Sequence, residues 1–401
     1  MAAPTLVTRL ATFRRDLPNL RRVVVKVGSN VLVGEARTTI DRRVFVDLNA
    51  SLAELATQGR EVILVTSGAV ALGRRLLGRA PSAEETLSTK QALAALGQPA
   101  LMDLYAHELS AYGVLPAQLL MTRDDLNARE RFLAARQTLR SLLAFQNVLP
   151  IVNENDTLSS EEIRFGDNDH LAALVAHLHE ADLLVILSDV VGLCDKDPRH
   201  HADALRLPVV SAEDASLEAL CTPAQTPGVG TGGMRSKILA ARTAAATGVP
   251  TLIAPGRQAG VLTRAIAGED IGTLLLPSSP RLGARKAWLR FASRPAGTVV
   301  VDEGARRALL HAGKSLLARG VLSIEGTFPP DSVVAIVGPD HQPLAQGLIA
   351  YSAEEARAIT GHRSEEISAI LGFSRGQALV HRDDLVLLHD TPSSEGISEP
   401  S

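Results

Sequence analysis

The sequence predicts an α/β fold around a mainly parallel sheet, followed by a smaller, β-rich second domain. With 401 residues, 46% of them hydrophobic, the chain can fill more than one core. From residue 23 to about 254, short apolar, β-branched runs alternate with longer helical patterns, which is typical of βα units stacked on a parallel sheet. After residue 277 short strand-like runs are punctuated by Gly, Pro and Asp, which indicates a different, β-rich architecture.

Five runs of the first domain are expected to be strands, and each ends in small or polar residues. In chain order they are RRVVVKVG (21–28), EVILVTSG (61–68), VLPIVNEND (148–156), ADLLVILSD (181–189) and VPTLIAPG (249–256). In open α/β sheets ligands bind at the carboxyl ends of strands, so chemistry is expected at these endings. Apolar residues at 171, 174, 175 and 178 follow helical spacing and predict an amphipathic helix just after GDND (166–169).

The second domain is expected to follow a linker over residues 277–294. Its strand-like runs are TVVVD (298–302), GVLSIEG (320–326), SVVAIVG (332–338) and QALVH (377–381). Residues 294–390 contain 9 Lys plus Arg against 12 Asp plus Glu, a balance of -3 that does not favour binding to a phosphate backbone. Residues 1–20 contain arginines but no uninterrupted apolar signal region, so a frayed extension is expected, with a short basic leader as the alternative. The polar tail after residue 390 is expected to be disordered.

Composition excludes several classes of protein. A net charge of -3 gives no global attraction to nucleic acid or to an anionic membrane. The two cysteines, Cys194 and Cys221, form no C-x-x-C pair, which favours a reducing cytosol. No apolar run approaches the roughly 20 residues of a membrane helix. We therefore expect a soluble, cytoplasmic protein.

Lys26 lies in VVVKVGSN, where valines flank its ammonium group. Such a charge would be buried without compensation unless it reaches an anion at the strand end. Gly28, two residues later, permits close approach of the backbone to a ligand. The alternative is a lysine on an edge strand whose aliphatic stem carries the charge out to water.

TSGAVALG (66–73) places Ser67 and Gly68 where a strand turns into a helix. Free N–H groups at the start of that helix could receive a carboxylate or a phosphate. The alternative is an ordinary capped turn between a strand and a helix.

VNEND and GDND are more polar than a connection between a strand and a helix requires. Their four acidic residues, Glu154, Asp156, Asp167 and Asp169, repel one another unless a cation lies among them. A substrate ammonium group, a lysine, or magnesium held through phosphate would satisfy them. The alternative is a turn-rich loop with Asp and Asn caps.

Two further segments indicate a nucleotide. Ser188 and Asp189 end the most apolar strand, at the sheet edge where nucleotides bind. GVGTGGMRSK (228–237) precedes a helical run, so its glycines offer N–H groups, the helix start offers positive potential, and Lys237 adds a full charge. The loop differs from the common G-x-x-x-x-G-K-[ST] phosphate loop. The alternative is a flexible glycine loop.

In this order, the motifs resemble those of the amino acid kinase family, from about residue 23 onward, and the C-terminal part resembles a PUA domain, a small β-barrel module. GDND together with GTGGM carries the specificity. The resemblance implies an αβα sandwich followed by the barrel. It also implies phosphoryl transfer from ATP, with Mg2+, to the side-chain carboxylate of L-glutamate. The product would be L-glutamyl 5-phosphate, in the first step of proline biosynthesis, with feedback inhibition by proline.

The same resemblance assigns roles to residues. Lys26 and Lys237 would grip the transferring phosphoryl group, Asp169 would hold the lysines in place, and Asp167 would belong to the same network. ATP contacts would be Lys26, Ser188, Asp189, Thr231, Gly232, Gly233, Met234, Arg235, Ser236 and Lys237. Glutamate contacts would be Ser67, Gly68, Asn153, Asp156 and Asn168. No direct metal ligand is expected, since Mg2+ would be held through the ATP phosphates. Ser188, in place of threonine, and Arg235, in place of a small polar residue, depart from the family pattern.

The domain boundaries follow from these assignments. We expect an extension over 1–20, a kinase domain over 21–276, a linker over 277–294, a PUA-like domain over 295–373, and a C-terminal segment with a disordered tail over 374–401. Expected partners are L-glutamate, proline as an inhibitor, further copies of the chain in a dimer or tetramer, and a downstream reductase, but neither a membrane nor RNA.

Two alternatives remain open. A kinase for another acidic metabolite would be distinguished by a panel of substrates. An RNA-binding or RNA-modifying protein is suggested only by the barrel and is disfavoured by its negative charge.

Overall fold

The computed structural model divides the chain into two compact units, Met1–Leu282 and Gly283–Ser401. The residues that it describes are 6–34, 39–82, 85–158, 168–198, 200–201, 203–218, 220, 233–278, 286, 289 and 295–388.

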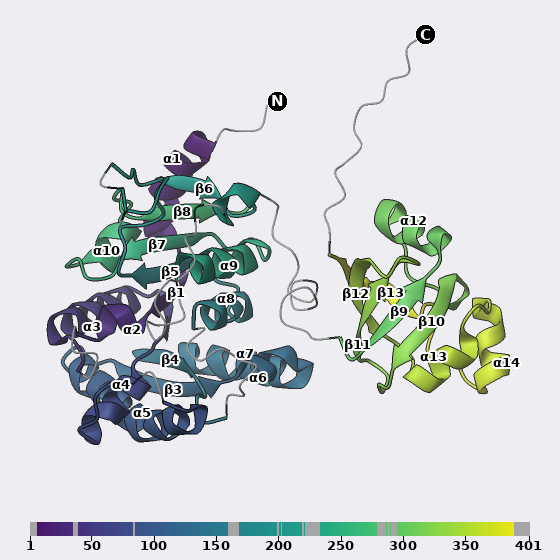
Figure 1. The fold of residues 1–401 in the computed structure, drawn as a ribbon, viewed down its shortest axis with the longest axis horizontal. Helices are drawn as coiled ribbons and strands as arrows, with labels where there is room; N and C mark the ends of the chain where they lie inside the picture. Colours follow the sequence, from purple (N-terminus) through teal and green to yellow (C-terminus); the bar gives the residue numbers. More distant parts are fainter. Residues whose placement is uncertain are drawn as a thin grey trace, which may run out of the picture. The chain divides into compact units, whose positions relative to one another are not determined.

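The first unit is built on an eight-stranded sheet with the order β3-β4-β2-β1-β5-β7-β8-β6 (Figure 1). Its elements are α1 (Leu6–Asp16), η1 (Leu17–Asn19), β1 (Arg22–Val27), α2 (Ser29–Leu32), α3 (Arg42–Thr57), β2 (Glu61–Val65), α4 (Ala69–Leu76), α5 (Leu87–Ser110), β3 (Leu115–Met121), α6 (Arg123–Asn127), α7 (Arg129–Ala144), β4 (Val148–Glu154), α8 (Asn168–Leu178), β5 (Leu183–Ser188), β6 (Val209–Ser211), η2 (Ala215–Glu218), α9 (Met234–Ala245), β7 (Thr251–Pro255), α10 (Val261–Ile266) and β8 (Thr273–Leu276).

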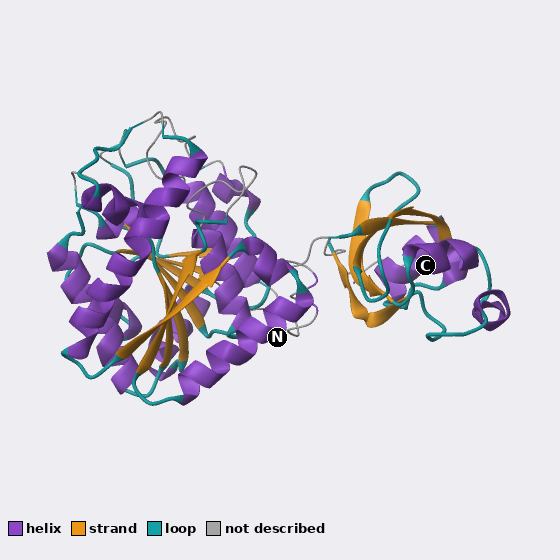
Figure 2. Cartoon of the chain, turned by 90° about the horizontal axis from the view of Figure 1, so that it is seen from below, coloured by secondary structure: helices purple, strands orange, loops and turns teal. Residues whose placement is uncertain are grey.

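The sheet confirms the predicted architecture. Its paired strands are parallel except for the antiparallel pair β7 and β8. Helices cover both faces (Figure 2), so the strands read as continuous apolar runs rather than as alternating ones. The five strands expected from sequence are β1, β2, β4, β5 and β7. β3, β6 and β8 were not predicted. No helix among the described residues combines the length and apolar character needed to cross a bilayer.

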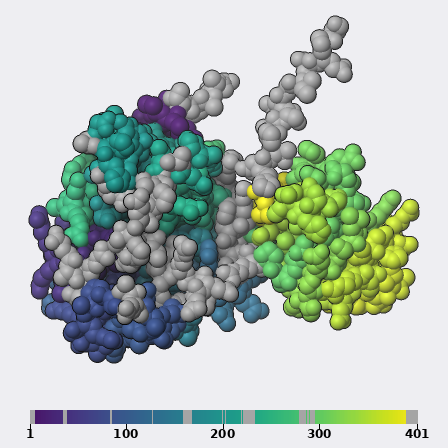
Figure 3. All heavy atoms as spheres, viewed as in Figure 1, coloured from purple at the N-terminus to yellow at the C-terminus, as the bar shows by residue number. Residues whose placement is uncertain are grey.

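Leu6–Asp16 form helix α1, so the expectation of a frayed extension is wrong for these residues. Leu10 and Phe13 of α1 pack against the core, and Leu17 is buried. Arg14 also forms an ion pair with Asp270 at 2.8 Å. In the space-filling view α1 lies on the surface of this unit (Figure 3). The leucine and phenylalanine residues in 6–17 follow amphipathic helical spacing, which agrees with this helix.

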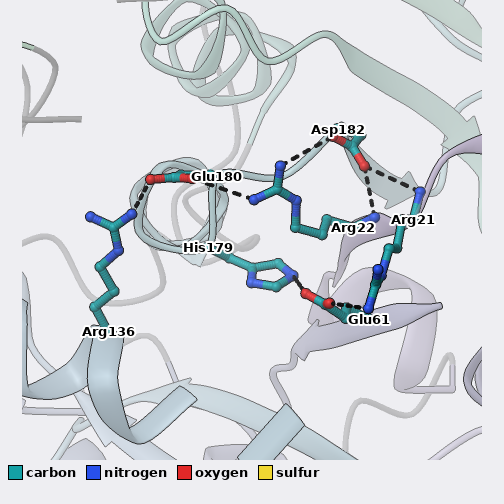
Figure 4. A network of polar contacts seen from close by, with 7 residues as sticks. All are labelled: Arg21, Arg22, Glu61, Arg136, His179, Glu180 and Asp182. Carbon is teal, nitrogen blue, oxygen red and sulfur yellow. Dashed lines mark hydrogen bonds and ion pairs between the residues drawn. The ribbon is translucent and has the colours of Figure 1, made fainter. Parts of the chain in front are cut away.

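A polar network closes the amino-terminal edge of the central strands. Its members are Arg21, Arg22, Glu61, Arg136, His179, Glu180 and Asp182 (Figure 4). Asp182, just before β5, accepts the backbone N–H groups of Arg21 (3.1 Å) and Arg22 (2.8 Å), which fixes the start of β1 beside β5. Burial lowers the pKa of His179 to about 4, so this ring is neutral near pH 7. Charges at this edge are therefore paired internally.

Helices α4 and α5 cross at two glycines in contact with backbone. A Cβ atom at Gly97 would lie 1.8 Å from the carbonyl oxygen of Ala69, and one at Gly73 would lie 1.9 Å from that of Leu93. Only glycine permits this approach. Since α4 begins directly after the turn that contains Ser67, the crossing fixes the middle of α5 beside that turn.

The second unit is a curved five-stranded sheet, ordered β10-β9-β11-β12-β13, around its own apolar core (Figure 2). Its elements are β9 (Gly297–Val301), α12 (Glu303–Ala312), η3 (Ala318–Gly320), β10 (Val321–Gly326), β11 (Val333–Val337), β12 (Pro343–Ile349), α13 (Ala353–Ile359), η4 (Ser364–Glu366), α14 (Ile367–Leu371) and β13 (Val380–Leu387). β13 pairs with β12, so this sheet extends beyond the expected boundary at residue 373.

We predict that Gly97→Ala destabilises the first unit by about 2 kcal/mol or more, because the added methyl group must displace backbone atoms of α4. An alanine in an unconstrained helix would instead stabilise it by up to about 1 kcal/mol. Thermal unfolding should show a fall in Tm of about 4 °C or more. Gly34→Ala is the control, because its Cβ atom would meet Thr39 at an ordinary 3.6 Å. An unchanged Tm for Gly97→Ala would contradict the tight crossing.

Candidate active site

The site is centred on a carboxylate that bridges two lysines. Asp169, in the first turn of α8, contacts Lys26 Nζ through Oδ1 at 2.5 Å and Lys237 Nζ through Oδ2 at 3.2 Å. Lys26 is the next-to-last residue of β1, and Lys237 lies in the first turn of α9. All three side chains are buried, with exposed fractions of 5% for Lys26, 1% for Asp169 and 6% for Lys237. Because β1 is central in the sheet, the edge-strand alternative for Lys26 is wrong.

In this bridge two positive side chains contact one negative side chain. Burial favours the neutral form of Asp169, but the two lysines and a hydrogen bond from Ser236 (2.7 Å) hold its pKa well below the usual range. Burial lowers the pKa of Lys237, the Lys26 charge acts in the same direction, and Asp169 opposes both. Two ammonium groups thus contact one carboxylate, and the Asp189 carboxylate also favours the charged form of Lys237. A bound anion would interact favourably with both ammonium groups.

The ends of β1 and β5 meet beside this bridge. A Cβ atom at Gly28 would lie 3.2 Å from Lys26 Nζ, so the backbone passes directly against the ammonium group. The amide of Asn30 donates to Asp189 Oδ2 at 3.3 Å, and Ser188 Oγ donates to Asp189 Oδ1 at 3.1 Å. Helix α2, which follows β1, is thereby tied to Asp189, the residue directly after β5.

A cluster of amides lies on the other side of the start of α8. The two N–H groups of Asn168 Nδ2 are shared among three acceptors: the Thr66 carbonyl (2.9 Å), Ser67 Oγ (2.9 Å) and Asn153 Oδ1 (3.1 Å). Consecutive helical residues point about 100° apart. Asn168 therefore reaches the ends of β2 and β4, while Asp169 reaches β1 and α9. One helix start joins the lysine bridge to the amide cluster.

Asp156 follows β4 in a desolvated position near Glu154. Burial raises the pKa of Asp156 to about 7, and the Glu154 carboxylate adds to the shift. Glu154 is itself buried. Two adjacent acidic side chains with little water favour a cationic ligand group.

The structure places other predicted residues as follows. Gly68 is the N-cap of α4 with a φ of 116°, which favours glycine. Gly233 is the N-cap of α9, so Met234, Arg235, Ser236 and Lys237 form the first turn of a helix and not a loop. Asp167, Thr231 and Gly232 lie outside the described residues.

Sequence reasoning missed Asn30, Thr66 and Gln98. Gln98 Oε1 accepts from Asn153 Nδ2 at 2.8 Å, which adds α5 to the amide cluster. The sequence offered one sign of this role, a lone glutamine between Gly97 and Pro99 in an apolar helical run. Asn30 was visible only as a polar residue in the turn after Lys26.

The described residues contain no group of three or more His, Cys, Asp or Glu side chains placed to hold a metal ion. The chemistry of the described site is instead that of an anion receptor, the two lysines and the start of α9, beside a polar cluster of amides and Asp156.

Comparison with known proteins agrees with this arrangement. The model of the amino acid kinase family matches residues 21–255, and that of the PUA domain matches residues 297–371. The glutamate 5-kinase of Pelobacter propionicus is 46% identical over 94% of this chain and 100% of its own. That of Trichlorobacter lovleyi is 47% identical over 93% and 98%, and that of Geobacter sulfurreducens is 45% identical over 93% and 99%.

Among solved structures, UMP kinase from Bacillus anthracis aligns with 66% of this chain and 99% of its own, at 15% identity and a TM-score of 0.45. The family model covers more than half of the chain, and the relatives match it over almost their whole length. The chain therefore belongs to the amino acid kinase family.

Proposed function

We propose that this chain is a glutamate 5-kinase, which transfers the terminal phosphoryl group of ATP to the side-chain carboxylate of L-glutamate. The observation that carries the proposal is the buried bridge of Lys26, Asp169 and Lys237 next to the amide cluster. The names of the relatives that match over 93–94% of this chain support the choice of glutamate.

The lysine bridge suits phosphoryl transfer. A glutamate carboxylate oxygen forms a bond to phosphorus while the bond between phosphorus and the ADP oxygen breaks, giving L-glutamyl 5-phosphate and ADP. The attacking carboxylate is already ionised, so no general base is needed. Lys26 and Lys237 would neutralise the phosphoryl oxygens, and Asp169 would hold both ammonium groups in place. Catalysis then depends on positioning and electrostatics.

ATP and glutamate would occupy the two sides of the start of α8. Ser188, Asp189 and the first turn of α9 would hold ATP, which supplies the phosphoryl group and carries Mg2+ on its phosphates. Ser67, Asn153 and Asn168 would bind glutamate, with Asp156 facing the substrate ammonium group. We assign Asp167, Thr231 and Gly232 to the same nucleotide side by their place in the sequence.

The chemistry of the product indicates which reaction follows. L-glutamyl 5-phosphate is a reactive acyl phosphate, so we expect a reductase to consume it on the route to proline, in the cytoplasm where ATP is available. We place all the chemistry in the first unit and expect no RNA binding by the second. A homodimer or homotetramer is expected, and light scattering on the purified chain would show a monomer if this is wrong.

An assay with hydroxylamine tests the proposed function. The full chain, ATP, Mg2+ and L-glutamate should produce glutamyl hydroxamate, because hydroxylamine traps acyl phosphates. A panel of L-aspartate, N-acetyl-L-glutamate and glutarate should give at most a few per cent of that rate. Formation of hydroxamate from another acid in preference to glutamate, or none from any, would reject the proposed function.

We predict that kcat/KM for glutamate depends on the ionisation of Asp156. Its pKa is raised to about 7, and an ammonium group binds the ionised carboxylate. The value of kcat/KM should therefore be level above about pH 8 and fall by about tenfold per unit below about pH 7. Asp156→Asn should weaken glutamate binding and remove the fall of kcat/KM below pH 7. Asp340→Asn in the second unit is the control and should change neither. If kcat/KM of Asp156→Asn still falls below pH 7, the assignment of Asp156 is wrong.

We predict that proline inhibits by competing with glutamate. Proline shares the α-carboxylate and α-nitrogen but lacks the side-chain carboxylate, so it could occupy the glutamate site without being phosphorylated. The proline concentration for half inhibition should rise in proportion to glutamate above its KM, and Asp156→Asn should weaken both ligands together. Titration with proline at several glutamate concentrations measures this. Inhibition that is independent of glutamate would place proline at a separate site.

A further inference from the structure

The side-chain amides of Gln98, Asn153 and Asn168 form a hydrogen-bonded row. Two backbone groups fix which amide atoms in it donate and which accept. The N–H of Glu154 can only donate, and it lies 2.9 Å from Asn153 Oδ1. The Thr66 carbonyl can only accept, and it lies 2.9 Å from Asn168 Nδ2. Asn153 Oδ1 is thus the acceptor for Asn168 Nδ2 at 3.1 Å, and Asn153 Nδ2 donates to Gln98 Oε1 at 2.8 Å.

With this direction, one polar atom remains at each end of the hydrogen-bonded row of three amides. Gln98 Nε2, a donor, and Asn168 Oδ1, an acceptor, are buried and have no hydrogen-bond partner among the described residues. Gln98 is 8% exposed and Asn168 is 4% exposed. Buried polar groups in folded proteins are almost always paired, because an unpaired one loses its hydration without compensation. A bound molecule that accepts at Gln98 and donates at Asn168 would satisfy both atoms.

We propose that Gln98 is a specificity-determining residue of the glutamate site, whose Nε2 donates a hydrogen bond to a carboxylate oxygen of the amino acid while Asn168 Oδ1 accepts from its ammonium group. This inference rests on the proposed function. An α-amino acid carries both of the complementary groups. Neutral amides also bind a carboxylate without placing a further charge beside Asp156 and Glu154.

The position of Gln98 is fixed independently of any ligand. The neighbouring Gly97 lies against the carbonyl of Ala69, where α4 begins after the turn with Ser67. A side chain held by such a tight helix crossing is pre-organised, so little conformational freedom is lost when the substrate binds.

Gln98→Met tests the proposal, because methionine keeps the length of the side chain and removes the donor, although it also removes the Oε1 acceptor of Asn153 Nδ2 that Gln98→Glu, below, retains. We expect the KM for glutamate to rise about tenfold or more, while the KM for ATP and kcat stay within about threefold. Asn49→Leu is the matched control. Asn49 is a second buried amide, which donates to the Phe45 carbonyl within α3 at 2.8 Å and leaves its Oδ1 without a partner among the described residues. Asn49→Leu should change Tm but leave the KM for glutamate and the KM for ATP unchanged.

Gln98→Glu provides a second variant with a different readout. The introduced carboxyl group can still accept from Asn153, but once ionised it repels a substrate carboxylate. Its KM for glutamate should therefore rise with pH relative to that of the wild type, over the range in which the wild-type KM is level. A purely structural role for Gln98 would not produce this dependence.

The proposal is wrong if either folded variant keeps the wild-type KM for glutamate within about twofold at every pH, since Gln98 would then serve packing or a buried water alone. That outcome leaves the proposed function intact. Absence of glutamyl hydroxamate with the wild type would instead reject the proposed function. In that case, calorimetric titration of glutamate into the wild type and into Gln98→Met tests the role of Gln98. Weaker glutamate binding by the variant would support the proposal. Equal binding, or no binding by either protein, would overturn it.

Discussion

The arrangement of the active site depends on one buried carboxylate that holds two ammonium groups. Lys26 and Lys237 come from segments 211 positions apart, and both ammonium groups contact the Asp169 carboxylate, which holds their like charges close together. Burial makes this arrangement unfavourable unless all three groups stay ionised and paired. The same helix turn places Asn168 among the amides, so the anion receptor and the glutamate site are set by adjacent residues of α8.

The two edges of the sheet are built differently, and this difference locates function. At the amino-terminal edge Asp182, Glu180 and Glu61 are satisfied by arginines and backbone N–H groups. At the carboxyl edge two ammonium groups contact the Asp169 carboxylate, Asp156 has a raised pKa, and Gln98 and Asn168 each leave a polar atom without a partner among the described residues. The unpaired atoms of Gln98 and Asn168 are therefore available to a ligand.

Much of this site could be predicted from the sequence because strand endings in a parallel sheet meet at one edge. That rule predicts Lys26, Asn153 and Ser188 near the carboxyl ends of β1, β4 and β5, where the structure has them. Their roles stay predictions. Gln98 could not be found in the same way, since it comes from the middle of α5 and depends on a glycine crossing between helices. Periodicity also missed β3, whose polar and exposed positions weaken the strand pattern, and it gave no role to α1.

The kcat of Asp169→Asn tests the central claim most directly. The substitution keeps the size of the side chain and removes the charge that holds both lysines, so kcat should fall by at least about 100-fold while the KM for ATP and for glutamate changes by less than about fivefold. Folding of the variant is checked by circular dichroism and by ATP binding. A folded variant with kcat within about threefold of the wild type would show that the bridge does not organise phosphoryl transfer.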